Sequence, residues 1–264
     1  MSKQNLKAFS LVELSIVVII LGLLVASVTV GKDLISAAKM RGLISQLKSF
    51  DTQISTFKLK YDDLPGDINN ASKRGLGSHN GDGDGLIEDG TADTTPDTFG
   101  YEISYFWEHL NKAGFADGAY DGDQNNGKIG ETFPQAKHGG GVIVYAENGQ
   151  NYYHVGLQDS TDGNPRVLNF ANTLVPEDAF SVDNKIDDGL PLKGKLVARS
   201  ASCTENPSSY TCAATPITVA SGGSSTTDGE ACVHQFGANQ STTLDEYDFS
   251  ATVVKCQLRL EMNN

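Results

Sequence analysis

The chain has 264 residues, of which 39% are hydrophobic, and 33 acidic against 20 basic side chains give a formal net charge of -13. Binding to nucleic acid requires clustered cations that neutralise phosphates, so this charge balance argues against a nucleic-acid partner. It favours divalent cations, or simply solubility. The length leaves room for one medium domain or two small ones beyond a membrane anchor.

The N-terminus is the most distinctive stretch of the chain. Residues 1–8 are polar and carry two lysines, and the run 14–30, directly after Glu13, contains no charge. An ordinary secretory signal peptide is the alternative, but the apolar run is too long for one, and a helical pattern continues past the place of a cleavage site. The sequence therefore predicts a transmembrane helix at about residues 9–31, with its cationic end in the cytoplasm.

Glu13 lies near the start of this span, where a carboxylate costs free energy unless it has a partner. No Lys or Arg lies between Glu13 and Lys32 in the sequence. If the chain is cut after Ala8, the new amino group of Phe9 is a cation at the same depth, on the same chain or on a neighbour. Such a pair favours the packing of many helices side by side and penalises a wrong register.

The sequence Lys-Ala-Phe-Ser-Leu-Val-Glu at residues 7–13, followed by a long apolar run, resembles the class III signal of type IV prepilins and type II secretion pseudopilins. The resemblance implies that a prepilin peptidase cuts between Ala8 and Phe9, that the new amino group of Phe9 is methylated, and that Glu13 guides assembly. The family usually has Gly before the cut. Here Ala8 takes that place, a small residue that permits processing but can slow it.

The helical pattern continues beyond the membrane span. Apolar side chains at alternating steps of four and three occupy Leu43, Leu47, Phe50, Ile54, Phe57 and Tyr61. This spacing forms one stripe on an α-helix, and no proline occurs before Pro65. A membrane anchor followed by an unrelated linker does not explain the stripe. We therefore expect one helix over residues 9–61, amphipathic at 32–61, and a globular domain at 62–264.

Residues 80–91 contain a candidate calcium loop. Oxygen-bearing side chains alternate along it and Gly85 takes the sixth place, as in the first nine positions of an EF-hand loop. The candidate ligands are Asn80, Asp82, Asp84, the Leu86 carbonyl, Glu88 and Asp89. Thr91 stands at the twelfth place, where the template has a bidentate acid, so either Asp89 or Asp93 substitutes for it or the site is weak. A flexible polar turn rich in Gly and Asp is the alternative.

A second loop, at residues 121–131, repeats the alternate-oxygen spacing less well. Its candidate calcium ligands are Asp121, Asp123 and Asn125. Lys128 brings a cation close to them, and a plain turn explains the loop equally well. Residues 183–189 lack the spacing and are predicted to form a solvated turn after a helix that starts near Pro176.

One short helix and one hairpin are expected in the middle of the chain. Apolar residues at helical spacing predict an amphipathic helix over residues 101–113, with Trp107 as a core anchor. Residues 141–157 read as a β-hairpin with Asn148 and Gly149 in the turn. His154, on the second strand of this hairpin, is predicted to be half-exposed.

Strand patterns recur at residues 195–199 and 252–260. We expect the four cysteines to form two disulfides, because this part of the chain would face an oxidising compartment. Three pairings are possible. Local pairing would join Cys203 to Cys212 and Cys232 to Cys256. The predicted fold class is α+β, similar to the pilin fold: a long N-terminal helix packed on a C-terminal antiparallel β-sheet domain with disulfides.

No enzymatic motif is visible, since the sequence lacks a zinc-protease helix motif, a nucleophile elbow and a phosphate-binding loop. The resemblance implies a structural subunit of a type IV pilus or a type II secretion pseudopilus. Its partners would be membrane lipid, prepilin peptidase, an inner-membrane assembly platform and other pilin-like subunits. The globular domain would be periplasmic before assembly, and the filament would lie in the periplasm or at the cell surface. A minor adhesive or ligand-binding subunit and a membrane-tethered enzyme are the alternatives.

Overall fold

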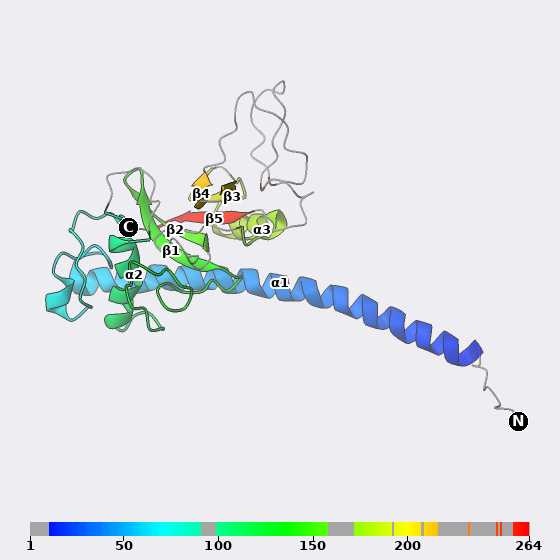
Figure 1. Cartoon of the computed structure of the whole chain (residues 1–264). Helices are drawn as coiled ribbons and strands as arrows, with labels where there is room; N and C mark the ends of the chain where they lie inside the picture. The colour runs from blue at the N-terminus through cyan, green and yellow to red at the C-terminus, as the bar shows by residue number, and fades with distance from the viewer. Residues whose placement is uncertain are drawn as a thin grey trace, which may run out of the picture. The chain divides into compact units, whose positions relative to one another are not determined.

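The computed structural model describes residues 11–90, 99–157, 172–191, 193–206, 209–215 and 256–263, together with Cys232, Tyr247 and Phe249 (Figure 1). The chain forms two compact units, one ending at Lys39 and the other beginning at Met40. Its elements in order are α1 (Leu11–Tyr61), the 3-10 helix η1 (Ala71–Arg74), α2 (Tyr101–Lys112), β1 (Gly141–Glu147), β2 (Gln150–Leu157), α3 (Pro176–Ile186), β3 (Leu196–Asn206), β4 (Ser209–Thr215) and β5 (Gln257–Glu261). The long helix and the antiparallel sheet confirm an α+β fold.

The first unit consists of the N-terminal part of α1. Its large apolar side chains, from Leu11 to Ile35, are between 50% and 84% exposed. At 1.5 Å per residue, twenty residues of this helix extend about 30 Å, which matches the hydrocarbon core of a bilayer. Among the described residues, α1 is the one helix that is long and apolar enough to cross a membrane.

The second part of α1 buries the predicted stripe in the globular unit. The side chains of Met40, Leu43, Leu47, Phe50, Ile54 and Phe57 are at most 7% exposed. The ring of Phe50 packs edge-on against Trp107, with their centroids 4.7 Å apart. After Tyr61, Asp62 turns the chain out of the helix with a φ of 59°, and Arg74 Nη1 donates a hydrogen bond to the Tyr61 carbonyl oxygen at 2.6 Å. The prediction of a helix that continues to Tyr61 is confirmed.

The strands form one antiparallel sheet with the order β1-β2-β5-β3-β4. The β1–β2 hairpin closes with Glu147 opposite Gln150. Between them Asn148 and Gly149 both have positive φ, 53° and 77°. A two-residue hairpin turn of this kind needs positive φ at both positions, which Asn and Gly tolerate. The hairpin prediction is therefore confirmed.

The other strands differ from their predicted bounds. β3 continues past the expected residue 199 because its first half pairs with β5 and its second half with β4. β4 was not predicted, since its small and polar residues show no apolar alternation. Of the strand expected at 252–260, the structure shows the part from Gln257 onward, and residues 252–255 lie outside the described residues.

His154 is fully buried, so the expectation of a half-exposed side chain is wrong. Its ring nitrogens lie 3.2 Å from the Tyr145 hydroxyl and 2.8 Å from Gln257 Oε1. Polar neighbours on β1 and β5 thus enclose the imidazole and satisfy both of its nitrogens. Sequence spacing along one strand does not reveal such partners, because they come from the neighbouring strands.

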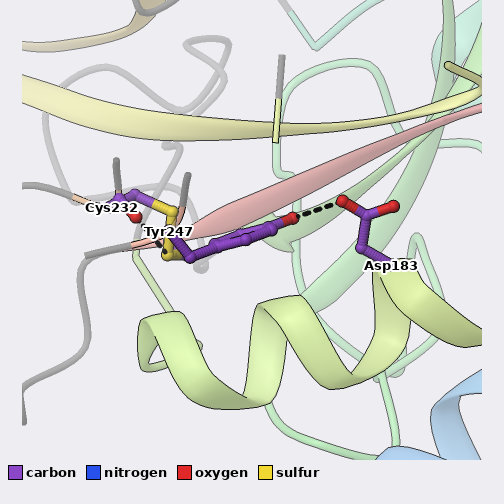
Figure 2. The surroundings of a disulfide bond; sticks show 4 residues. Asp183, Cys232 and Tyr247 are labelled. Atoms are coloured by element: carbon purple, nitrogen blue, oxygen red, sulfur yellow. Dashed lines mark hydrogen bonds between the residues drawn. A yellow bond between two sulfur atoms is a disulfide. The ribbon is translucent and has the colours of Figure 1, made fainter. Parts of the chain in front are cut away.

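Asp183 also corrects the sequence analysis, because it is fully buried within α3 and not part of a solvated turn. Its Oδ2 accepts a hydrogen bond from the Tyr247 hydroxyl at 2.8 Å (Figure 2), and its Oδ1 accepts one from the Gly189 amide at 3.3 Å. Burial raises the pKa of the Asp183 carboxyl to about 6. This carboxylate therefore connects α3 to a segment that lies far along the chain.

A disulfide joins Cys232 to Cys256 beside Tyr247 (Figure 2). Cys256 also pairs with Leu174 in an isolated β-bridge next to the start of β5. For the other two cysteines, the β3–β4 register places Cys203 opposite Cys212, and their side chains lie outside the described residues.

Removing the Cys232–Cys256 disulfide is expected to lower the free energy of unfolding by about 2–4 kcal/mol, because the bond closes a loop of 24 residues in the unfolded chain. The measurement is denaturant unfolding of the full chain in detergent, with both cysteines replaced by Ser. A Cys203→Ser/Cys212→Ser variant is the matched control and reports the effect of the other two cysteines. An unchanged unfolding midpoint in the Cys232→Ser/Cys256→Ser variant contradicts a stabilising role for this bond.

Candidate functional site

The first candidate site is the start of α1. Glu13 lies near the N-terminal end of the part of α1 that the structure describes, which begins at Leu11. It is the one acidic residue in an otherwise apolar run that extends to Val30. Ala8 and Phe9, the residues on either side of the expected cleavage, lie outside the described residues.

The second candidate site is the loop at residues 80–89. The buried carboxylate of Asp67 accepts hydrogen bonds from the backbone of this loop. Asp67 Oδ1 accepts hydrogen bonds from the backbone amides of Gly83 at 2.6 Å and Asp84 at 3.1 Å, and its Oδ2 accepts one from Gly85 at 2.9 Å. The exposed fraction of Asp67 is 0%. One carboxylate thus shapes three consecutive residues of the loop.

Two further buried side chains attach the same loop to the fold. Glu102, in the first turn of α2, accepts hydrogen bonds from the amides of Asp82 at 2.9 Å and Glu88 at 3.1 Å. Asn151 on β2 accepts one from the Ile87 amide and donates one to the Gly85 carbonyl oxygen, both at 2.9 Å. Helix α2 and strand β2 therefore fix a loop whose composition alone suggests flexibility.

This arrangement brings together the carboxylates of Asp67, Asp82 and Asp84, each of which offers one oxygen within 4.8 Å of the others. The loop spacing predicted Asp82 and Asp84 as ligands but missed Asp67. Glu88 and Asp89 are not part of this group. Hard cations such as Ca²⁺ prefer carboxylate oxygens, so the donor set fits this class of ion.

Asn80, another expected ligand of the first loop, has a different contact. Asn80 Oδ1 accepts a hydrogen bond from the Ser72 amide at 2.9 Å. The Leu86 amide donates to Asp84 Oδ1 at 2.8 Å, so this part of the loop also forms a local turn. Thr91 and Asp93, the residues considered for the twelfth place, lie outside the described residues.

Burial disfavours the ionised form of the two carboxyl groups that hold this loop, those of Asp67 and Glu102. Burial raises the pKa of Asp67 to about 6, and the charges of Asp63 and Asp84 add to the shift. Burial raises the pKa of Glu102 to about 8, with Asp67 and Asp82 contributing. A bound divalent cation reverses this tendency, because it is the largest local charge and stabilises the ionised carboxylates.

The second loop is held by hydrogen bonds typical of a turn. Asp121 Oδ1 accepts from the Asp123 amide at 3.1 Å, and Asp123 Oδ1 accepts from the Asn125 amide at 2.8 Å. Lys128 forms an ion pair with Glu131 at 3.5 Å. These contacts agree with the turn interpretation, which needs no metal.

Another acidic group, Asp183, Asp187 and Asp188, has a structural explanation. Asp187 Oδ2 accepts hydrogen bonds from the amides of Lys195 and Leu196, and Asp188 Oδ1 accepts one from Leu190 at 2.8 Å. Since these carboxylates bind backbone amides of the chain that leads into β3, they stabilise the connection between α3 and the sheet.

A cavity of about 500 Å³ lies between α1 and the segments 116–120 and 134–137. The titratable side chains in its lining are Asp117, Tyr120 and Lys137.

Comparison with known proteins adds no assignment: no protein-family model matches the sequence, and neither a curated protein nor a solved structure matches it.

Proposed function

We propose that this chain is a structural subunit of a filament of the type IV pilus or type II secretion pseudopilus class. The observation that carries the proposal is the first part of α1, where every large apolar side chain from Leu11 to Ile35 is at least half exposed and Glu13 lies near the N-terminal end of the described part. Leaving a Leu or Ile side chain in water costs about 1.5–3 kcal/mol. This segment therefore needs lipid or other helices of its kind around it.

In the proposed mechanism, the apolar helix moves from lipid into contact with other helices of its kind. A prepilin peptidase cuts between Ala8 and Phe9 and the new amine is methylated, while the apolar helix holds the subunit in the inner membrane. Glu13 then pairs with the Phe9 amine of a neighbouring subunit. During assembly the contacts of the helix with lipid are replaced by contacts with other helices, and the globular unit remains in the aqueous phase.

Within this function, calcium has a structural role at Asp67, Asp82 and Asp84. The ion would neutralise three carboxylates that lie within 4.8 Å of one another and fix the loop at residues 80–89 against α2 and β2. The chemistry that the ion would supply is charge neutralisation.

The function is tested by producing the chain in cells that supply a prepilin peptidase and an assembly platform. We expect the processed chain in the fraction sheared from cells or spheroplasts, as thin filaments visible by electron microscopy. Processed protein that stays entirely in the membrane fraction, without filaments, contradicts the proposal and leaves a membrane-anchored domain.

In the presence of a chelator, the stabilising contribution of the protonated Asp67 and Glu102 carboxyl groups is expected to be lost as the pH rises from about 4 to about 8. The folded-state pKa values of Asp67 and Glu102, about 6 and about 8, lie above their ordinary values. At these two groups the folded state therefore binds more protons than the unfolded state across this range, and their contribution to stability is lost as these protons dissociate. Denaturant unfolding at a series of pH values measures the slope.

Calcium is expected to reduce or reverse this slope, because it favours the ionised carboxylates. Asp82→Asn, at an exposed position of the group, is the matched variant: it keeps the size of the side chain and weakens the calcium effect. The calcium site is wrong if calcium leaves both the slope and the unfolding midpoint of the parent chain unchanged.

A further inference from the structure

The cavity beside α1 in the globular unit is lined on one side by a polar stripe of this helix. The members of the stripe follow one another at steps of three and four residues, so they lie on one face of α1: Gly42, Ser45, Ser49 and Gln53. The stripe runs beside the buried apolar stripe that contains Leu47 and Ile54. One face of α1 therefore packs in the core, and the neighbouring face presents hydrogen-bonding groups to the cavity.

The side chain of Gln46 holds the opposite wall of the cavity in place. Its Nε2 donates a hydrogen bond to the Gln135 carbonyl oxygen at 2.8 Å, and its Oε1 accepts one from the Lys137 amide at 2.9 Å. Both bonds go to backbone atoms, so they fix this segment against α1. The cavity measures about 500 Å³, within the range of about 300–1,000 Å³ for small-molecule sites. It is much larger than the volume of about 30 Å³ that one water molecule takes.

Two buried polar atoms of the lining residues have no hydrogen-bond partner in the part of the chain that the structure describes. They are Trp107 Nε1, which is a donor, and Gln53 Oε1, which is an acceptor. Trp107 is fully buried, and the other end of the Gln53 amide, Nε2, donates to Ser49 Oγ at 3.2 Å. A buried indole N–H usually has a partner, and leaving it unpaired costs free energy. A ligand that both accepts and donates hydrogen bonds would satisfy both atoms.

The rest of the lining favours a neutral ligand with an apolar face. The buried side chains that line the cavity carry no formal charge: Phe50, Trp107, Ala116, Tyr120 and Pro134. The charged side chains in the lining are one anion and one cation, Asp117 and Lys137, and both are exposed. A hydroxyl group donates and accepts at a single oxygen. A sugar ring combines several hydroxyl groups with a C–H face that packs on aromatic side chains.

We propose that this cavity binds a neutral sugar. One hydroxyl group accepts a hydrogen bond from Trp107 Nε1, another donates to Gln53 Oε1, and the C–H face of the ring packs on the aromatic side chains. We expect a dissociation constant on the order of 1 mM, which is usual for a ligand of this size. The site shares no residue with the candidate calcium group, and the inference does not rest on the filament function.

The fluorescence of Trp107 reports directly on this cavity, because Trp107 is the only tryptophan in the chain. The test titrates the full chain with glucose and with N-acetylglucosamine, in a detergent that has no sugar head group. We expect a saturable change in the emission with at least one of the two sugars. Glycine, a small zwitterion, is expected to cause no such change.

Three variants locate the binding. Gln53→Leu removes the acceptor at similar size and is expected to weaken binding about fivefold, the loss that corresponds to one neutral hydrogen bond. Ser45→Phe fills the cavity from an exposed position and is expected to abolish binding. Thr52→Val is the matched control: it replaces an exposed polar residue of α1 outside the lining and is expected to bind like the parent chain. Near-ultraviolet circular dichroism checks that each variant is folded.

The proposal is overturned if neither sugar causes a saturable change, which leaves a cavity that holds water. A response to glycine overturns the assignment to a sugar. A change that persists in a folded Ser45→Phe variant places the sugar elsewhere on the chain. If Ser45→Phe does not fold, the other two variants decide, and equal affinities of Gln53→Leu and Thr52→Val overturn the site. All of these outcomes leave the filament function intact.

Discussion

Replacing Glu13 by Gln is expected to abolish filament formation, with at least a tenfold loss in the sheared fraction, while the chain still enters the membrane. The amide is nearly the same size as the carboxylate but cannot form an ion pair with the Phe9 amine of a neighbour. It is also easier to bury in lipid than an ionised carboxylate, so insertion is preserved or improved. Immunoblots of the sheared and membrane fractions measure both effects in one experiment.

Two controls separate the charge of Glu13 from its size and position. Glu13→Asp keeps the charge on a shorter side chain and is expected to retain part of the yield. Ser15→Ala changes a neighbouring residue, whose hydroxyl donates to the Val12 carbonyl oxygen within the helix, and is expected to assemble normally. Filaments from the Gln variant in normal amounts contradict the proposed pairing.

Trp107→Ala is expected to destabilise the globular unit by about 3–5 kcal/mol, the range for removing a large buried aromatic side chain. Trp107 is fully buried, and its ring centroid lies 4.7 Å from that of Phe50, 5.1 Å from that of Phe106 and 6.1 Å from that of Tyr120. The indole therefore joins α1, α2 and the chain after α2. Denaturant unfolding of the full chain in detergent, followed by near-ultraviolet circular dichroism, measures the loss.

Leu59→Ala is the matched control for this prediction, since Leu59 lies on the same long helix as Phe50 but is 89% exposed. Its replacement is expected to change the free energy of unfolding by no more than about 0.5 kcal/mol. A Trp107→Ala variant as stable as the Leu59→Ala variant contradicts the packing of α1 on the globular unit through this residue.

The parts of the fold that the sequence predicted are those with a local signal. The buried stripe on α1, from Leu43 to Phe57, follows from helical periodicity, and the hairpin turn at Asn148–Gly149 follows from the need for positive φ. Strand β4 carries no such signal, because small and polar residues do not distinguish a strand from a loop. Its pairing with β3 depends on the register of the two strands.

The candidate metal group was only partly predictable, because only some of its residues have a local sequence signal. Asp82 and Asp84 follow a loop spacing that is visible along the chain, whereas Asp67 joins them from a separate segment. Its position after Leu64-Pro65-Gly66 marks a turn and carries no information about the loop that it binds. The burial of His154 and Asp183 was missed because their partners, Gln257 and Tyr247, lie far away in the sequence.

The most direct test of the proposed function is the intact mass and N-terminal peptide of the chain recovered from a membrane that contains prepilin peptidase. The account predicts a chain that begins at Phe9 with a methylated amino group, followed by the span that contains Glu13. A chain that retains Met1, or one cut well inside the apolar run near Ala26, contradicts the filament mechanism, because the amine proposed to pair with Glu13 would then not exist.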